Sequence, residues 1–201
     1  MAASSLSNTT AMVLCPPRDV WPAIDQIRNT HDKAACKWPP HVNLCFPFVP
    51  SHKFETRKVA LEAKMARIPS FTITLDTFAT VGTSKKKEGR RFICLVPNVS
   101  NSEALGAVKS ALKSVFPECT PRVEVHLTVG QAKGEECPKL IEQFEKQWNR
   151  LTWTVDNVAF LEKTKSRFEV RGKIALGSPE TRAPEAGESE QKTKNEGKRK
   201  K

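Results

Sequence analysis

Two histidines occupy matching positions in two short apolar segments of the chain. His41 opens the tetrapeptide His-Val-Asn-Leu, and His126, 85 positions later, opens His-Leu-Thr-Val. In an extended strand, residues two apart point to the same face, so each imidazole would share a face with Asn43 or Thr128 while apolar side chains fill the other face. Each segment therefore predicts a half-buried strand that presents an imidazole beside a small hydrogen-bonding side chain.

These four side chains, if they are brought together, suit an in-line displacement at phosphorus. One imidazole would take a proton from the nucleophile, and the other would give a proton to the leaving oxygen. The amide and the hydroxyl would hold the nonbridging phosphate oxygens, on which negative charge builds up. We therefore predict His41 and His126 as the catalytic pair and Asn43 and Thr128 as substrate-binding residues, with no metal ligands and no cofactor.

The repeated position of the two histidines is what favours catalysis, since a single histidine in a half-buried strand is more often structural. His31 and His52 have no such equivalent and are interpreted as surface residues. Cys36, His41, Cys45 and His52 follow one another closely, but their spacings fit no common structural zinc site. The cysteines of the chain, which form no CxxC pair, are interpreted as free or buried thiols of a reducing compartment.

The elements that must position these residues follow from the apolar periodicity of the chain. Alternating short strands and amphipathic helices are predicted, with a capping box at Ser100 and Glu103 opening the third helix and Pro138 in the first turn of the fourth. The predicted strands cover 12–15, 41–48, 71–81, 90–96, 123–129, 151–161 and 168–176. The pattern predicts an α+β protein.

The order of these elements repeats along the chain. Residues 13–16 resemble residues 94–97, and in each case a helix and then a histidine strand follow; further on, residues 71–76 resemble residues 151–156. This duplication predicts two pseudo-symmetric lobes within residues 11–176, each an antiparallel sheet with helices on one face, flanking a central cleft. The two histidines would then converge in that cleft.

Both ends of the chain lack the apolar residues that a packed element needs. Residues 1–10 are small and polar, without the pattern of a secretory signal, and we expect them to be flexible. Residues 177–201 have alanine as their only aliphatic residue and no aromatic residue, so we expect a disordered tail. The tail ends in Lys-Arg-Lys-Lys, which fits a nuclear import signal or an electrostatic arm.

The longest apolar runs have five residues, against the ~20 that cross a bilayer, so we expect no membrane contact. We predict a monomer in the cytoplasm or the nucleus.

The net charge of +11 is carried mostly by the predicted folded body, because the tail has seven Lys and Arg against five Glu. A basic body suggests a polyanionic partner such as RNA or a nucleotide, although excess lysine also serves solubility. The cluster of 85–87, Arg90 and Arg91 would contact an RNA backbone or form a solvated turn. Phe46, Phe48 and Phe168 could stack a base, but core packing is favoured for each.

The two tetrapeptides resemble the paired H-x-[ST]-x motifs of the two-histidine phosphoesterase superfamily, which includes 2′-5′ RNA ligase-like and cyclic nucleotide phosphodiesterase proteins. The resemblance covers about residues 11–176; the second motif is a full match, and the first departs at Asn43, where the family has Thr or Ser. An amide can still donate a hydrogen bond to a phosphate oxygen. The resemblance implies a bilobal fold, metal-free chemistry, and 2′,3′-cyclic phosphates or 2′-5′ linkages of RNA as substrates.

The leading hypothesis is a metal-independent phosphoesterase that acts on RNA ends or small nucleotides. The alternative is a non-catalytic RNA- or nucleotide-binding protein that keeps the same cleft, which Asn43 and the basic body fit equally well. A third hypothesis, an adaptor that binds proteins through its tail, rests on composition alone.

Overall fold

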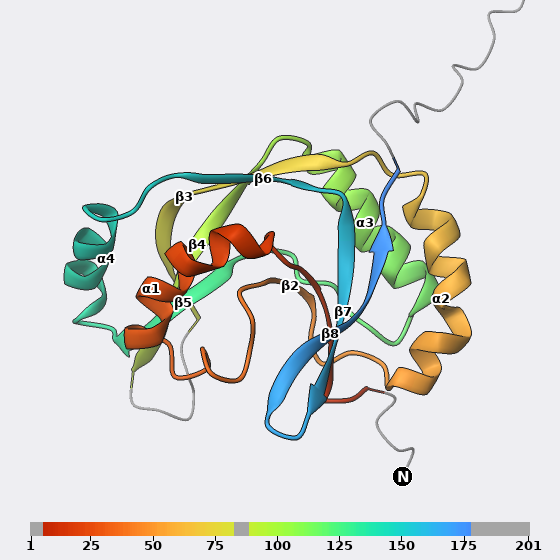
Figure 1. Ribbon diagram of the computed structural model, residues 1–201, viewed down its shortest axis with the longest axis horizontal. Helices are drawn as coiled ribbons and strands as arrows, with labels where there is room; N and C mark the ends of the chain where they lie inside the picture. The colour runs from red at the N-terminus through yellow and green to blue at the C-terminus, as the bar shows by residue number, and fades with distance from the viewer. Residues whose placement is uncertain (1–5, 83–88, 178–201) are drawn as a thin grey trace, which may run out of the picture.

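The computed structural model describes residues 6–82 and 89–177, which fold into one antiparallel sheet with helices packed against it (Figure 1). The eight strands lie in the order β6-β3-β4-β5-β2-β1-β7-β8. Their bounds are β1 Thr10–Leu14, β2 Val42–Cys45, β3 Phe71–Val81, β4 Arg90–Val99, β5 Leu127–Lys133, β6 Leu151–Val155, β7 Asn157–Thr164 and β8 Arg167–Ala175. The helices are a 3₁₀ turn at Arg18–Val20, α1 Trp21–His31, α2 Ser51–Met65, α3 Ser102–Val115 and α4 Cys137–Glu145.

The sheet divides into two four-stranded halves that meet where β5 pairs with β2. Helix α1 packs on β5 and α4 on β3 and β4, whereas α2 packs on α3 and β8. Helices α1 and α4 thus lie over one half and α2 and α3 beside the other, as Figure 1 shows. The α+β fold with two pseudo-symmetric lobes is confirmed, and the lobes share one continuous sheet.

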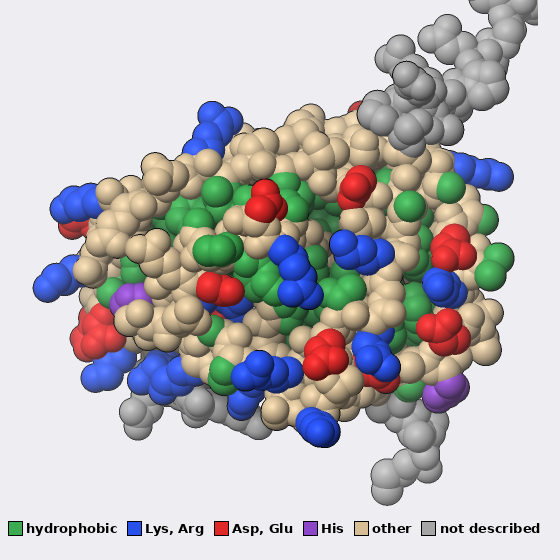
Figure 2. Space-filling model, viewed as in Figure 1, with side chains coloured by type: hydrophobic (Ala, Val, Ile, Leu, Met, Phe, Trp, Pro, Cys, Tyr) green, Lys and Arg blue, Asp and Glu red, His purple; other side chains and the backbone are tan. Residues whose placement is uncertain are grey.

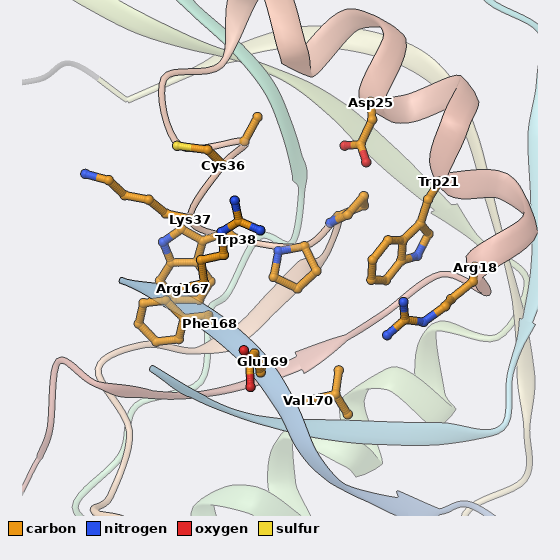
Figure 3. A pocket seen from close by; sticks show the side chains of 13 residues that line it. Arg18, Trp21, Asp25, Cys36, Lys37, Trp38, Arg167, Phe168, Glu169 and Val170 are labelled. Carbon is orange, nitrogen blue, oxygen red and sulfur yellow. The ribbon is translucent and has the colours of Figure 1, made fainter. Parts of the chain in front are cut away.

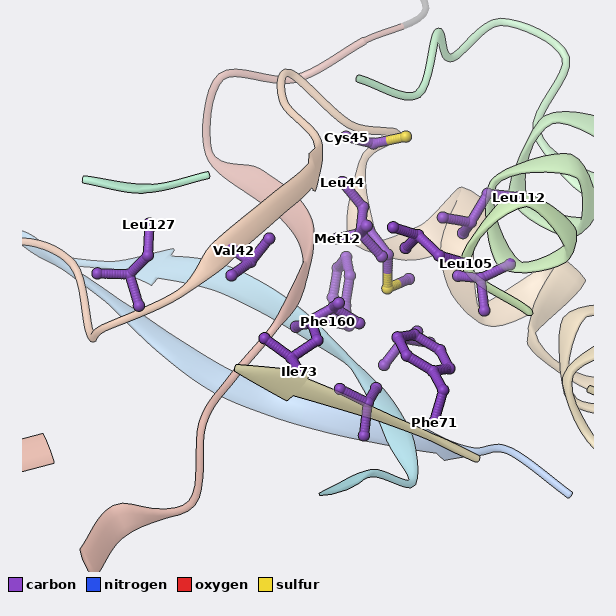
Figure 4. Close-up of a cluster of buried hydrophobic side chains, with 14 of the residues drawn as sticks. Met12, Val42, Leu44, Cys45, Phe71, Ile73, Leu105, Leu112, Leu127 and Phe160 are labelled. Atoms are coloured by element: carbon purple, nitrogen blue, oxygen red, sulfur yellow. The ribbon is translucent and has the colours of Figure 1, made fainter. Parts of the chain in front are cut away.

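The core follows from the alternation of side chains along the strands. Met12, Leu14 and Phe160 lie on the face that α2 and α3 cover and join the main hydrophobic cluster, part of which Figure 4 shows. Ala11 and Val13 point to the opposite face, where a smaller cluster forms beneath Trp38 and Phe46. Strand β1 is therefore buried along its whole length, and the segment that leads to His41 is held against the sheet.

The strand predicted at 151–161 is divided at Asp156 into β6 and β7, because its two parts pair with different lobes. Strand β6 pairs with β3, and β7 pairs with β1. In the other half of the sheet, the strand in the place equivalent to β3 is therefore β7, not β6. The equivalence of residues 71–76 with residues 151–156, which the sequence suggested, is wrong. The cap of α3 is also corrected: Asn101, not Ser100, is the N-cap, and its Oδ1 accepts the Ala104 N–H at 2.9 Å.

The N-terminal segment differs from the predicted flexible residues 1–10. Ser7 exchanges backbone hydrogen bonds with Phe48, and Thr10 is a buried residue of β1 whose hydroxyl donates to the Val49 carbonyl. Gly177, the first residue of the predicted tail, is hydrogen-bonded to Ile68 and Ser70. The rest of the tail and the basic cluster at 85–87 lie outside the described residues. Within the described ranges, no helix is long and apolar enough to cross a membrane.

Candidate active site

The two histidine segments meet at the seam between the two halves of the sheet. Val42 of β2 lies directly opposite Leu127 of β5 in an antiparallel pair. Continuing this register places His41 opposite Thr128, and Asn43 opposite His126. Because side chains directly opposite each other share a face, each imidazole lies across from the polar residue of the other tetrapeptide. Each histidine immediately precedes its strand: the strand predicted at 41–48 is shortened to Val42–Cys45, and the strand predicted at 123–129 is shifted to Leu127–Lys133.

All four predicted site residues line one cavity of about 450 Å³. The structure thus brings His41, Asn43, His126 and Thr128 together, as the duplication requires. Aromatic and polar side chains that the sequence did not single out complete the wall, among them Arg28, Asp32, Trp38, Phe92, Arg122 and Gln131.

His41 is held in one orientation by a hydrogen bond and a stacked ring. Its Nδ1 lies 2.8 Å from the Pro39 carbonyl oxygen, and its ring stacks on Trp38 with centroids 4.9 Å apart. A carbonyl oxygen only accepts, so Nδ1 carries the proton and Nε2 keeps its lone pair. Burial lowers the pKa of His41 to about 4, helped by the nearby charge of Arg28 and opposed by the Pro39 hydrogen bond. His41 is therefore a neutral imidazole with a free acceptor nitrogen.

His126 and Asn43 carry polar atoms that have no hydrogen-bond partner among the residues that the structure describes. The buried Nδ1 of His126 and the buried Oδ1 of Asn43 are both unpaired. Burial lowers the pKa of His126, the positive charge of Arg122 lowers it further, and Glu124 opposes this shift. An unpaired buried polar atom costs free energy, about 1–3 kcal/mol each. Two such atoms on facing residues of one cavity indicate a site built to be completed by a ligand.

Thr128 lies opposite Cys94 of β4. The Thr128 hydroxyl is 3.6 Å from the Cys94 sulfur, and burial raises the pKa of that thiol to about 12. Cys94 is thus a neutral, inert neighbour, and the hydroxyl of Thr128 remains available to a ligand.

A buried guanidinium fixes the segment that leads to His41. Arg28 of α1 is only 2% exposed. Its Nε donates to Asp32 and one terminal nitrogen to Asp25, each at 3.1 Å, and the other terminal nitrogen donates to the Trp38 carbonyl at 2.9 Å. Asp32 also accepts from Gln131 of β5 at 3.3 Å. This network connects α1 to both histidine segments. In the sequence, the four-residue spacing of Arg28 and Asp32 on a predicted helix is the feature that could have indicated this ion pair.

The phenylalanines near the histidine motifs lie in different surroundings. Phe48 is buried in the core, as favoured, whereas Phe46 lines the cavity. Phe168 is buried in the smaller cluster, as favoured; it stacks on Trp38 with centroids 3.5 Å apart and borders a neighbouring cavity. Phe92, which the sequence analysis missed, is 37% exposed and lines the histidine cavity.

The histidines outside the motifs differ from each other. His52 is exposed, as predicted. His31 is half-buried, because its ring packs edge-on against Phe144 with centroids 4.8 Å apart.

All six cysteines are free thiols. Among residues 6–82 and 89–177, no group of three or more His, Cys, Asp or Glu side chains is placed to hold a metal ion.

Comparison with known proteins agrees with this geometry. A family model described as the 2′-5′ RNA ligase superfamily matches residues 16–167. The fold and the paired histidine motifs define the chain as a two-histidine phosphoesterase type of protein, and it belongs to the 2′-5′ RNA ligase superfamily. No curated protein sequence matches the chain.

Solved structures share the fold at low sequence identity. Escherichia coli LigT complexed with 3′-AMP is 16% identical, with a TM-score of 0.52 over 85% of this chain and 99% of LigT. LigT complexed with ATP is likewise 16% identical, with a TM-score of 0.51 over 87% of this chain and 100% of that one. A structure described as a phosphoesterase has a TM-score of 0.50 at 16% identity, over 85% and 99% of the two chains.

Proposed function

We propose that this protein is a metal-independent phosphodiesterase that acts on 2′,3′-cyclic phosphates or 2′-5′ phosphodiester bonds of RNA ends or small nucleotides. The observation that supports this function is the reciprocal register at the seam, which sets each imidazole across from the polar residue of the other motif. This arrangement surrounds one small volume with two proton-transfer groups and two hydrogen-bonding groups. Membership of the 2′-5′ RNA ligase superfamily supports the same class of reaction.

Hydrolysis of a cyclic phosphate would proceed by one displacement at phosphorus. A water oxygen forms a bond to phosphorus and loses a proton to one imidazole, while the opposite P–O bond breaks and its ribose oxygen takes a proton from the other imidazole. The product is a phosphomonoester, and the two histidines exchange their protonation states. No oxidant, reductant or second substrate besides water is required.

We assign the base to His41 and the acid to His126. The Nδ1–H of His41 is committed to the Pro39 carbonyl, so the free Nε2 can accept a proton from water. The buried Nδ1 of His126 has no acceptor among the described residues, and a bound phosphate would favour its protonated form through charge attraction.

Asn43 and Thr128 would hold the nonbridging oxygens of the phosphate. Among the described residues, the Asn43 amide has its Oδ1 unpaired and its nitrogen available to donate, and the Thr128 hydroxyl has only the weak Cys94 contact. Arg122 also lines the cavity, and in this proposal its charge attracts the anionic substrate. The alternative, a binding protein without catalysis, uses the same groups and is distinguished by activity.

The test is hydrolysis of 2′,3′-cyclic mononucleotides in the presence of EDTA. Wild type should convert them to monophosphates, whereas His41→Ala and His126→Ala should lose about 10²- to 10⁴-fold in rate, the usual contribution of a positioned acid or base. His52→Ala, which removes an exposed histidine that does not line the cavity, is the matched control and should keep wild-type rates. Tight nucleotide binding without turnover by wild type would favour the non-catalytic alternative.

A further inference from the structure

Two further cavities continue from the histidine cavity along one face of the protein, the first adjoining it and the second adjoining the first. The first, about 530 Å³, lies between the segment at 35–40 and strand β8, and shares Trp38 with the histidine cavity. The second, about 430 Å³, lies between the start of α1 and the turn from β6 to β7. It shares Arg18, Trp21 and Val170 with the first. Figure 2 shows this face hollowed at its centre, with apolar side chains at the surface and lysines and arginines beside them.

An ion pair links the first cavity to the histidine cavity, in addition to the shared Trp38. Asp25, which lines it, is paired at 3.1 Å with Arg28, which lines the histidine cavity. Trp38 is in stacking contact with both His41 and Phe168. A chain that leaves the histidine site over the edge of Trp38 would therefore enter this cavity, in which Figure 3 shows Trp38 beside Phe168.

Charge favours an anionic occupant of this track. Arg18, Lys37 and Arg167 line the first cavity, are exposed, and have no carboxylate partner within the described part of the chain. Its two carboxylates are Glu169 and Asp25, and Asp25 shares the single charge of Arg28 with Asp32. In the second cavity, Lys173 and the shared Arg18 outnumber Asp156, and both cations are close enough to lower the pKa of Cys15 against the effect of its burial.

The track also offers an aromatic surface. Trp21 is half-buried, is fixed by its Nε1 donating to the Pro16 carbonyl at 2.9 Å, and borders both cavities. The Arg18 guanidinium lies 4.8 Å from the centre of its ring. Alternating cations and aromatic rings along a groove are the features that bind single-stranded nucleic acid, because cations track the phosphates and rings stack the bases.

We infer that the two additional cavities form a track for single-stranded RNA, in which the nucleotides preceding the reacting 3′ end lie beside Trp38, Trp21 and the exposed cations. The placement of the 3′ end rests on the proposed function, and the binding of RNA to the track does not. The physiological substrate is then an oligonucleotide rather than a mononucleotide, since one nucleotide would fill only the histidine cavity.

The test measures binding and turnover separately. Affinity for a 3′-phosphorylated single-stranded RNA of about ten nucleotides is measured by fluorescence anisotropy at several salt concentrations, alongside a mononucleotide 3′-phosphate. Wild type should bind the oligonucleotide at least tenfold more tightly, with a steep salt dependence. The variant Arg18→Gln/Lys37→Gln/Arg167→Gln should lose on the order of a hundredfold in affinity at ~0.1 M salt. The slope of log affinity against log salt concentration should fall in magnitude by about 2, because each lost phosphate contact contributes about 0.7.

Two single substitutions sharpen the test. Glu169→Gln, which removes the unpaired carboxylate of the first cavity, should tighten oligonucleotide binding severalfold. Arg67→Gln, which removes an exposed cation just after α2, should leave binding unchanged. Equal wild-type affinity for mononucleotide and oligonucleotide, or an unchanged salt slope in the triple variant, would overturn the inference. Displacement of the RNA by an acidic peptide at equal concentration would also overturn the inference, because it would identify a protein partner.

Turnover separates this inference from the proposed function. If the triple variant hydrolyses a 2′,3′-cyclic mononucleotide like wild type but loses activity on the cyclic end of an oligonucleotide, both are supported. If wild type hydrolyses neither, but the triple variant still loses RNA affinity, the proposed function fails and the track stands.

Discussion

Val42 and Leu127 are the register partners that join the two halves of the sheet. Each is the residue that directly follows a motif histidine, so their pairing sets His41 and His126 one step to either side of a local two-fold axis. A shift of one residue in this register would turn the polar set toward the core, because side chains alternate between faces. The chemistry of the cavity therefore depends on a backbone pairing between two apolar residues.

The two histidines should act as one unit. Each single alanine substitution removes one of two proton transfers in the same step, so the double variant His41→Ala/His126→Ala should be little slower than the slower single variant. The measurement is the rate of cyclic nucleotide hydrolysis by the four proteins. Additive losses, in which the double variant shows the product of the two single effects, would contradict a shared step.

The pH dependence should be centred on the acidic side of neutrality. In the proposed mechanism, the free enzyme must hold one neutral and one protonated imidazole, and the pKa values of both are lowered from 6.5, that of His41 to about 4. As pH rises through the lowered pKa of His126, the acid is lost, so kcat/KM should already be falling below pH 6.5.

Arg122→Gln tests the cause of the lowered pKa of His126. Arg122 lowers the pKa of His126, so its removal should raise that pKa and move the alkaline limb of kcat/KM to higher pH, whatever happens to the maximum. Arg150→Gln, an exposed arginine that does not line the cavity, is the control. An alkaline limb that stays in place in Arg122→Gln would show that this charge does not act on the catalytic acid.

Asn43 should bind phosphate through its amide group. Asn43→Thr restores the residue type of the second motif and should keep activity, whereas Asn43→Ala should lose on the order of tenfold to a hundredfold, somewhat below the loss for a deleted oxyanion donor. The loss should appear in kcat/KM for cyclic nucleotides. Wild-type rates in Asn43→Ala would reject the role.

The stability of the fold should depend on pH through His41. Its pKa is about 4 in the folded protein and near 6.5 when unfolded, so below pH 6.5 the unfolded chain binds a proton that the folded chain does not. Folding free energy should thus be lost as pH falls from 6.5 toward 4, by up to about 1.4 kcal/mol per pH unit. Urea unfolding at pH 7 and pH 5 measures this loss, which should shrink in His41→Asn and persist in His52→Asn.

Arg28 should be essential for the stability of the site. Arg28→Met leaves the buried Asp32 carboxylate without its cation, and removing one partner of a buried pair costs about 3–5 kcal/mol. Arg28→Met/Asp32→Leu should recover part of that loss, because no buried charge then remains unpaired. Urea midpoints of the three proteins provide the measurement; a double variant less stable than Arg28→Met would contradict this explanation.

The sequence by itself determined the strand faces and the four residues that meet in the histidine cavity, because the alternation of side chains is local and the duplication makes two weak motifs informative together. It also identified Phe48 as a core residue and His52 as exposed, since each follows from the polarity of its immediate neighbours. Tertiary structure decided what depends on pairing between distant segments. The register of Val42 with Leu127 and the division of 151–161 at Asp156 are set by strand partners, which local periodicity does not encode. The role of Arg28 is set in the same way, because two of its three acceptors lie within its own helix region but the third, the Trp38 carbonyl, is reached only when the loop folds back onto α1.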